Sequence, residues 1–325
     1  MTLTFTSKST LYHRLLTLFL LIPLAASAQK DAQFSLFSLN QLYLNPAAAG
    51  ADGLTKFQLT HRTQYVGYQS TNLSDDGGAL STQLFSFSMP IKNFGIGFYA
   101  LNDKSGPRND QDFKLSAAYR IPLAGGNLQV GASAGMFRQA LDYGKLRARD
   151  QDDPLIQTGV ISEMNPDFAV GVRYENEVFY AGASLNHLLK PKYQLGSENG
   201  TNPLPQTVYF NAGVNVELGY LLDIQPIVLV KSDINTVSVE GGATVTYNKR
   251  YWVGGTYRQQ DTYFIIMGGV YLLPDQSLRL SGAYDMVIGG NKAKAPSSFE
   301  VMLSYALPSP KFGKKTIIRT PRFRF

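Results

Sequence analysis

Strict alternation of apolar and polar side chains is the feature that most limits how this chain can fold. The pattern is clearest along residues 208–218, where Val, Phe, Ala and Leu residues fall on one face and Tyr, Asn, Gly and Glu residues on the other. Residues 128–136 and 278–288 repeat it. A period of two predicts a β-strand with one polar face. Each run is also long enough to cross a bilayer at a tilt, which takes roughly 9–11 residues.

Strand-like stretches of this kind cover most of the chain. We expect fourteen of them, and one, residues 262–273, is apolar on both faces, so that its inward direction cannot be assigned from sequence. The expected strands are residues 54–66, 79–89, 94–101, 111–121, 127–140, 167–175, 178–187, 206–218, 223–231, 236–247, 251–258, 262–273, 277–287 and 298–307.

The connections between these strands alternate between long polar loops and short turns. Outer-membrane barrels have short periplasmic turns and longer external loops, and an even number of strands leaves both chain ends in the periplasm. The sequence therefore predicts an all-β fold, a transmembrane antiparallel β-barrel of about fourteen strands in the outer membrane. A secreted β-sandwich is the alternative, but it does not explain the sorting of loop lengths. The expected long loops are residues 67–78, 102–110, 141–166, 188–205 and 288–297, while 232–235 and 259–261 are short where long ones are expected.

The N-terminus has the pattern of a secretory signal peptide. Lys8 and Arg14 precede an apolar run at residues 15–24, and Ala26-Ser27-Ala28 forms an A-x-A cleavage site. The run is too short for a membrane-spanning helix. We therefore expect four regions: a signal peptide at 1–28, a periplasmic or plug segment at 29–53, an outer-membrane barrel at 54–307 and a basic periplasmic tail at 308–325.

Composition narrows the chemistry and the partners. The chain has no cysteine, which excludes disulfides and a thiol nucleophile. Its formal charge of +6 owes much to residues 311–325, which hold six basic residues and no acidic one. Behind a signal peptide, such a tail favours an acidic protein surface or lipid headgroups as its partner, and no nucleic acid.

We expect no enzymatic activity, cofactor or metal. After the signal peptide the chain has two histidines, His61 and His187, and neither has a serine and a carboxylate at a recognisable spacing. No phosphate-binding glycine motif occurs. The loop at residues 147–154 groups three aspartates but lacks the glycine and final glutamate of an EF-hand, so a solvated loop is the expectation.

An Asn-Pro-Ala segment, residues 45–50, separates the predicted signal peptide from the first strand. Asn45 is suited to cap a helical turn, Pro46 to occupy its first position, and Gly50 to end it in a left-handed conformation. We expect a compact turn after a short helix at residues 34–44, placed at the periplasmic mouth or folded into the lumen as a plug. A stiff turn without functional contacts is the alternative.

Four charged residues on polar strand faces are expected to meet in the lumen. Arg62 shares the polar face of the first strand with Gln64, and closure of the barrel pairs that strand with the last one, which carries Glu300. Arg258 and Asp285 fall near the ends of neighbouring strands. Charged groups inside a membrane protein usually face a polar cavity and pair there. The cluster would either close the seam of the barrel or bind a client protein.

Several further motifs occur in a fixed order along the chain. They are the Asn45-Pro46-Ala47…Gly50 box, RTQYVG at 62–67 with Gln64 and Gly67, NPDFAVGVRY at 165–174, YAGASLNHLLKPKY at 180–193, YWVGGTYRQQD at 251–261, LSGAYDMVIG at 280–289, SSFEVMLSYAL at 297–307, and the terminal TPRFRF with Pro321, Arg322 and Phe323. In this order and spacing the chain resembles the PorP/SprF family of Bacteroidetes outer-membrane proteins. Two positions depart from the family pattern, since Tyr65 replaces a usual tryptophan and Phe299 a frequent histidine.

The resemblance implies a component of the type IX secretion system, associated with gliding motility. Such a barrel helps to secrete or anchor a cell-surface, adhesin-like client protein carrying a type B C-terminal sorting domain, and its partners would include that client, components of the periplasmic secretion ring and outer-membrane lipid. The alternative is a FadL-like outer-membrane channel for small hydrophobic molecules, in which the Asn-Pro-Ala segment is the gate.

Overall fold

A computed structural model describes residues 31–66, 80–146, 158–195, 202–233, 236–259, 263–288 and 297–308. The predicted signal peptide, Gly67, the aspartate-rich loop at 147–154 and the tail residues Pro321, Arg322 and Phe323 lie outside these ranges.

Strands make up most of the described chain. A short N-terminal segment precedes them and contains the helix α2 (Gln41–Leu44) and the 3₁₀ turn η1 (Pro46–Ala48). The further elements are β1 (Leu54–Gln64), β2 (Leu80–Ile91), β3 (Phe94–Ser105), β4 (Arg108–Leu123), β5 (Gly126–Asp142), η2 (Tyr143–Lys145), β6 (Val160–Glu175), β7 (Phe179–Asn186), β8 (Lys192–Tyr193), β9 (Asn202–Pro203), β10 (Thr207–Val214), β11 (Val216–Leu218), β12 (Leu222–Ser232), β13 (Val237–Tyr247), β14 (Tyr251–Arg258), β15 (Tyr263–Tyr271), β16 (Leu278–Val287) and β17 (Ser298–Pro308).

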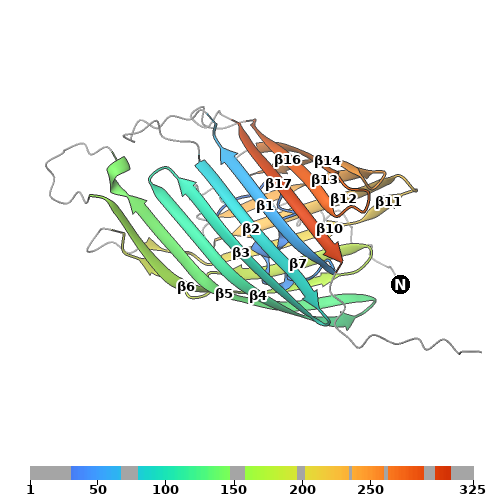
Figure 1. Ribbon diagram of the computed structural model, residues 1–325, viewed down its shortest axis with the longest axis horizontal. Helices are drawn as coiled ribbons and strands as arrows, with labels where there is room; N and C mark the ends of the chain where they lie inside the picture. The colour runs from blue at the N-terminus through green and yellow to red at the C-terminus, as the bar shows by residue number, and fades with distance from the viewer. Residues whose placement is uncertain are drawn as a thin grey trace, which may run out of the picture.

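The main sheet closes on itself as an antiparallel barrel (Figure 1). Its first strand pairs with its last, with Leu54 opposite Pro308. The sheet has fifteen strands, and β10 and β11 are two halves of one strand because both pair with β12 on either side of Asn215. The wall is therefore a closed barrel of fourteen strands, which confirms the predicted fold class. β8 and β9 pair with each other in a separate two-stranded sheet, which packs against Phe137 of β5 through Tyr193.

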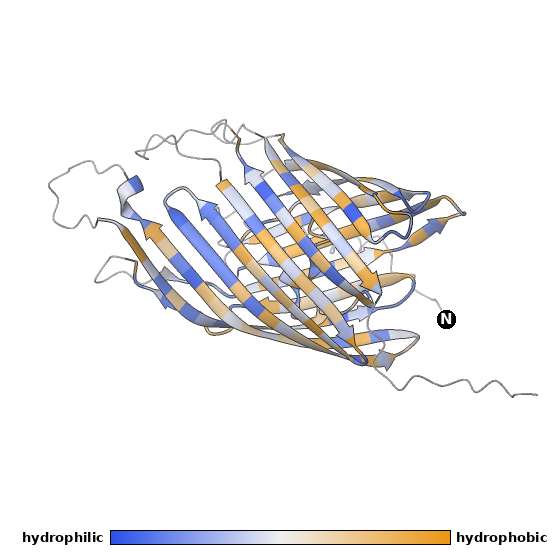
Figure 2. Cartoon of the chain, viewed as in Figure 1, coloured by the Kyte–Doolittle hydropathy of each residue, from blue (hydrophilic) through white to orange (hydrophobic). Residues whose placement is uncertain are grey.

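Three strands extend beyond the predicted bounds. β4 begins at Arg108 and β3 ends at Ser105, so the expected loop at 102–110 is a tight turn. β6 begins at Val160, inside the expected loop at 141–166. These extensions carry many polar residues, which hid them from a search for amphipathic runs. Figure 2 shows the polar residues gathered at the upper-left ends of β3 and β4, beyond the more apolar middle of the wall.

Side chains on the wall alternate between an exposed outer face and a buried inner face. On β1, Gln58, Thr60 and Arg62 are buried in the lumen, while His61 is exposed outside. On β15 the ambiguity left by the sequence is resolved, because Ile265 and Met267 face inward. No helix in the described ranges is both long and apolar enough to span a membrane.

The N-terminal residues 31–53, called the plug below, fill the lumen. Their apolar side chains are almost fully buried, and they pack in two clusters against inward-facing wall residues, one around Tyr99 and Tyr209 and the other around Ile265. The predicted helix at 34–44 is reduced to α2, and residues 35–39 form turns instead. There the backbone amides of Ser35 and Leu36 donate to the Glu300 carboxylate on the wall. The buried plug residues include Phe34, Leu36, Phe37, Leu42, Tyr43, Leu44, Ala47, Ala48 and Ala49.

Candidate functional site: the contacts that hold the plug

The Asn-Pro-Ala segment forms the compact turn that its residue types suggest. Asn45 is extended, and its side-chain oxygen accepts a hydrogen bond from the Ala47 amide at 2.9 Å, which caps η1. Pro46 occupies the first position of the turn. Gly50 has a φ of +65°, and a Cβ there would lie 2.9 Å from backbone atoms of Pro90 and Gly95. Both the conformation and the close packing therefore require glycine.

Asn45 also fastens the plug to the wall. Its side-chain nitrogen donates to the backbone oxygens of Val172 on β6 at 2.9 Å and Ala183 on β7 at 3.3 Å. The carboxamide lies directly on Gly171, where a Cβ would come within 2.1 Å of the Asn45 oxygen. A glycine in β5 makes a similar approach, since a Cβ on Gly131 would lie 2.5 Å from the Ala47 nitrogen. The wall thus provides a shallow seat without side chains for this turn.

A buried charge cluster holds the plug at Ser35. The Arg62 guanidinium lies 2.6 Å from Asp285 and 3.2 Å from Glu300. The Ser35 hydroxyl accepts a hydrogen bond from Arg62 and donates one to Asp285 at 2.6 Å. The Glu300 carboxylate accepts a hydrogen bond from the Ser35 backbone amide at 2.6 Å. The cluster therefore joins β1, β16 and β17 to the plug, rather than only closing the barrel seam.

Arg258 lies beside this cluster, and its main partner is a residue not singled out from the sequence. Its guanidinium pairs with Glu240 at 2.7 Å, while its distance to Asp285 is 4.0 Å. It also donates to the Phe34 backbone oxygen of the plug at 3.5 Å. Gln64, half-buried at the end of β1, does not join these contacts.

A second charge cluster, absent from the sequence-based predictions, anchors the start of the plug. Asp31 contacts the His187 ring at 3.0 Å, and the other ring nitrogen of His187 lies 2.7 Å from Asp167. Lys114 is the last member of this cluster, and its Nζ lies 2.7 Å from the Asp167 carboxylate. From β12, two strands along the wall from β7, Lys231 donates to the Asp31 backbone oxygen at 2.8 Å.

The pKa of the His187 ring, which lies just beyond the end of β7, reflects these contacts. Burial lowers it, but the carboxylates of Asp31 and Asp167 outweigh that effect and raise the pKa to about 9. Burial alone raises the pKa of Asp31, whereas the charge and hydrogen bond of His187 bring it far below its ordinary value. His187 is therefore protonated at neutral pH and forms an ion pair with the plug.

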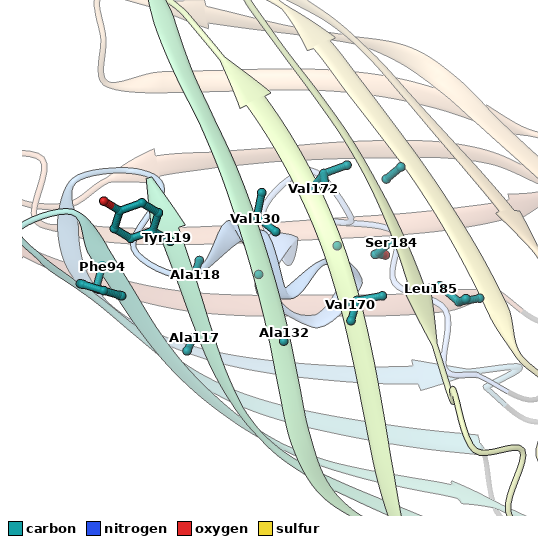
Figure 3. A pocket seen from close by; sticks show the side chains of 13 residues that line it. Phe94, Ala117, Ala118, Tyr119, Val130, Ala132, Val170, Val172, Ser184 and Leu185 are labelled. Carbon is teal, nitrogen blue, oxygen red and sulfur yellow. The ribbon is translucent and has the colours of Figure 1, made fainter. Parts of the chain in front are cut away.

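An apolar groove of about 620 Å³ lies behind the Asn45 seat, on the outer face of the wall. Figure 3 shows Phe94 and Tyr119 at one side and Leu185 at the other, with the pale-blue N-terminal segment passing behind the strands. Exposed side chains such as Val130 and Val172 line the groove, so it faces the surroundings of the barrel rather than its lumen.

The fold and these contacts define a class of protein, a plugged β-barrel of the outer membrane. Comparison with known proteins gives the family. The family described as type IX secretion system membrane protein PorP/SprF matches residues 26–305, and the chain belongs to it. No curated protein matches the chain in sequence.

Solved structures support the architecture. The toluene transporter TbuX of Ralstonia pickettii has a TM-score of 0.52 and 14% identity, over 82% of this chain and 92% of that chain. A mutant of the monoaromatic hydrocarbon channel TodX has a TM-score of 0.50 and 10% identity, over 82% of this chain and 94% of that chain. At such low identity the likeness shows the fold alone. The fold and the family place the chain in the outer membrane.

Proposed function

We propose that this barrel serves type IX secretion by binding other proteins, and that it helps to secrete or anchor one cell-surface, adhesin-like client with a type B C-terminal sorting domain. Family membership supports a role in the secretion system. The plug supports binding over conduction, because residues 31–53 fill the lumen. They are held by the buried ion pair of Asp31 with His187 and by the hydrogen bonds of Ser35 to the charged cluster on the wall. In this proposal the protein is not an enzyme, and its charged lumenal side chains serve to hold the plug.

The single observation that carries this proposal is the match over residues 26–305. Deletion of the gene tests it. We expect one large surface protein to disappear from the cell surface, while the uptake of small hydrophobic compounds stays unchanged. Quantitative proteomics of surface and periplasmic fractions measures the first effect, and a labelled toluene uptake assay the second. An unchanged surface proteome would contradict the proposal.

A second candidate, a channel for small hydrophobic molecules, is favoured by one observation, the apolar groove against the Asn45 seat. The groove has a suitable size for a small apolar ligand. However, the residues that line it face outward, and the lumen behind it is occupied by the plug. The same deletion strain distinguishes the two candidates, because a channel predicts reduced uptake with the surface proteome intact.

A further inference from the structure

A polar cavity of about 310 Å³ opens between the plug and the wall at the end of the barrel that carries the short turns. We call it the vestibule. Its lining includes Asp52 and Gln41 of the plug and Lys56, Arg173, Glu175 and Arg279 of the wall. Outer-membrane barrels place their short turns in the periplasm. The vestibule therefore faces the compartment from which secreted proteins arrive.

The charges of the vestibule do not balance. Lys56 forms an ion pair with Asp52, and Arg173 lies 3.1 Å from Glu175. Arg279 has no carboxylate within ion-pair distance among the described residues. Three cations thus face two carboxylates, and the excess positive charge is located on Arg279.

Arg279 is also poorly satisfied as a hydrogen-bond donor. Its Nε is buried and has no partner in the part of the chain that the structure describes. Among the described residues its side chain makes one hydrogen bond, from Nη1 to the Tyr271 hydroxyl at 3.4 Å, and its guanidinium lies 5.6 Å from the centre of the Tyr271 ring. A guanidinium presents a planar fork of donors that fits a carboxylate in a bidentate manner. The Arg279 guanidinium, which has no carboxylate partner among the described residues, lines the vestibule.

We propose that the vestibule binds a carboxylate of a polypeptide that reaches the barrel from the periplasm, with Arg279 as its main partner. The carboxylate would complete the charge balance and pair with donors that now have none. A lipid phosphate is disfavoured as the source, because the vestibule lies inside the wall, between β1, β6 and β16, where lipids alongside the barrel do not reach. This inference rests on the proposed function for the identity of the partner as a secreted or secretion-ring protein.

The chain offers a matched control in Arg250. This residue is exposed in the turn between β13 and β14, at the same end of the barrel, and its guanidinium also lies 5.6 Å from a tyrosine ring, that of Tyr251. Arg250 does not line the vestibule. Arg279→Gln and Arg250→Gln therefore remove the same charge and the same kind of stacking, but only the first removes it from the cavity.

Binding of a blocked peptide with two adjacent glutamates to the purified, detergent-solubilised full chain tests the inference, and thermophoresis measures the affinity. We expect Arg279→Gln to weaken binding at least tenfold, Arg279→Lys to weaken it less, and Arg250→Gln to leave it unchanged. The shift of the folded band in unheated gels verifies that each variant is folded.

Three outcomes would overturn the inference. Equal binding by Arg279→Gln rules out the site, and equal binding of the glutamine version of the peptide rules out a carboxylate. Displacement of the peptide by phosphatidylglycerol in nanodiscs assigns the site to lipid. Failure of this assay remains distinguishable from failure of the proposed function, because the deletion strain reports on the surface protein independently of peptide binding.

Discussion

The charged residues that hold the plug are almost fully buried, so the stability of the barrel depends on their being paired. Arg62 is 2% exposed, and Asp285 and Glu300 are buried to a similar degree. Transfer of such charges from water costs several kcal/mol for each ion, which the mutual attraction offsets only when the geometry is good. The loss of one member leaves the others unpaired, so a single substitution should have a large effect.

We predict that Arg62→Met destabilises the folded barrel by about 3–5 kcal/mol, because it leaves two buried carboxylates without their cation. Arg250→Met is the control, because Arg250 is exposed in the turn between β13 and β14 and forms no ion pair with any residue that the structure describes. Such surface substitutions usually change stability by less than about 0.5 kcal/mol. Urea unfolding from lipid vesicles measures both free energies. Similar values for the two variants would contradict the assignment of Arg62 as an anchor.

His187 makes the stability of the plug dependent on pH. Its pKa of about 9 in the folded protein lies above the ordinary value of 6.5, so its contribution is fully present below pH 6.5 and is lost as the pH rises through 9. The facing charged groups are Asp31 from the plug, Asp167 from β6, and Lys114 beyond Asp167.

We therefore predict that wild type exceeds His187→Gln in unfolding free energy by about 3 kcal/mol at pH 6. The difference should fall steadily above pH 6.5 and be nearly gone above pH 9, because the histidine of the unfolded chain loses its proton near pH 6.5 while the folded ring keeps its proton up to about pH 9. Denaturant titrations at a series of pH values measure it. A difference that does not vary with pH would show that His187 acts through packing alone.

At the scale of elements, the plug depends on a close fit between the Asn-Pro-Ala turn and the bare backbone of β5 and β6. Because the Asn45 carboxamide lies on Gly171, a single added methyl group should lift the turn from its seat. The turn also links the cluster around Ser35 to β1, so its displacement should loosen the whole plug.

We predict that Gly171→Ala increases ion conductance in planar bilayers and destabilises the barrel by about 1–3 kcal/mol, which is typical of overpacking. Gly241→Ala on β13 is the control, because a Cβ there meets only the Ile227 oxygen at 3.8 Å, an ordinary contact. Single-channel recordings compare the two variants with wild type. Silent recordings from Gly171→Ala would indicate that the plug tolerates the displacement.

The wall was more predictable from sequence than the plug. In a strand such as β10, successive side chains point alternately into the lumen and out of the barrel. The local alternation of polar and apolar residues is therefore enough to predict the strand. The path of the plug is set by distant groups, such as Glu300, which binds the amide of Ser35. Asp31 and His187 were missed for the same reason, because they are 156 positions apart and no spacing links them. The signal available was weak: a histidine at a strand end with a left-handed backbone, φ +58°.

At the scale of the whole molecule, the barrel and the plug together form a closed body. A fourteen-stranded wall encloses more space than its own side chains fill, and residues 31–53 supply the missing core. Arg62 and Lys231 reach the plug from different strands, so the plug also braces the wall from within. Apart from the vestibule, the plug thus fills the lumen, which supports the role in binding proposed above.

We predict that excision of residues 31–53, with residues 1–30 and 54–325 retained, converts the protein into an open pore. The wall pairs β1 with β17 without the help of the plug, so the barrel should still form, although less stably because it leaves Asp285 and Glu300 exposed to water inside the lumen. Conductance in planar bilayers should rise from near zero to stable open steps, and cells should become sensitive to antibiotics that the outer membrane normally excludes. The full-length chain, expressed at the same level, is the control. If the truncated barrel is folded but shows no conductance, a segment other than residues 31–53 closes the lumen. That result would contradict the assignment of these residues as the plug and remove the structural argument for binding over conduction.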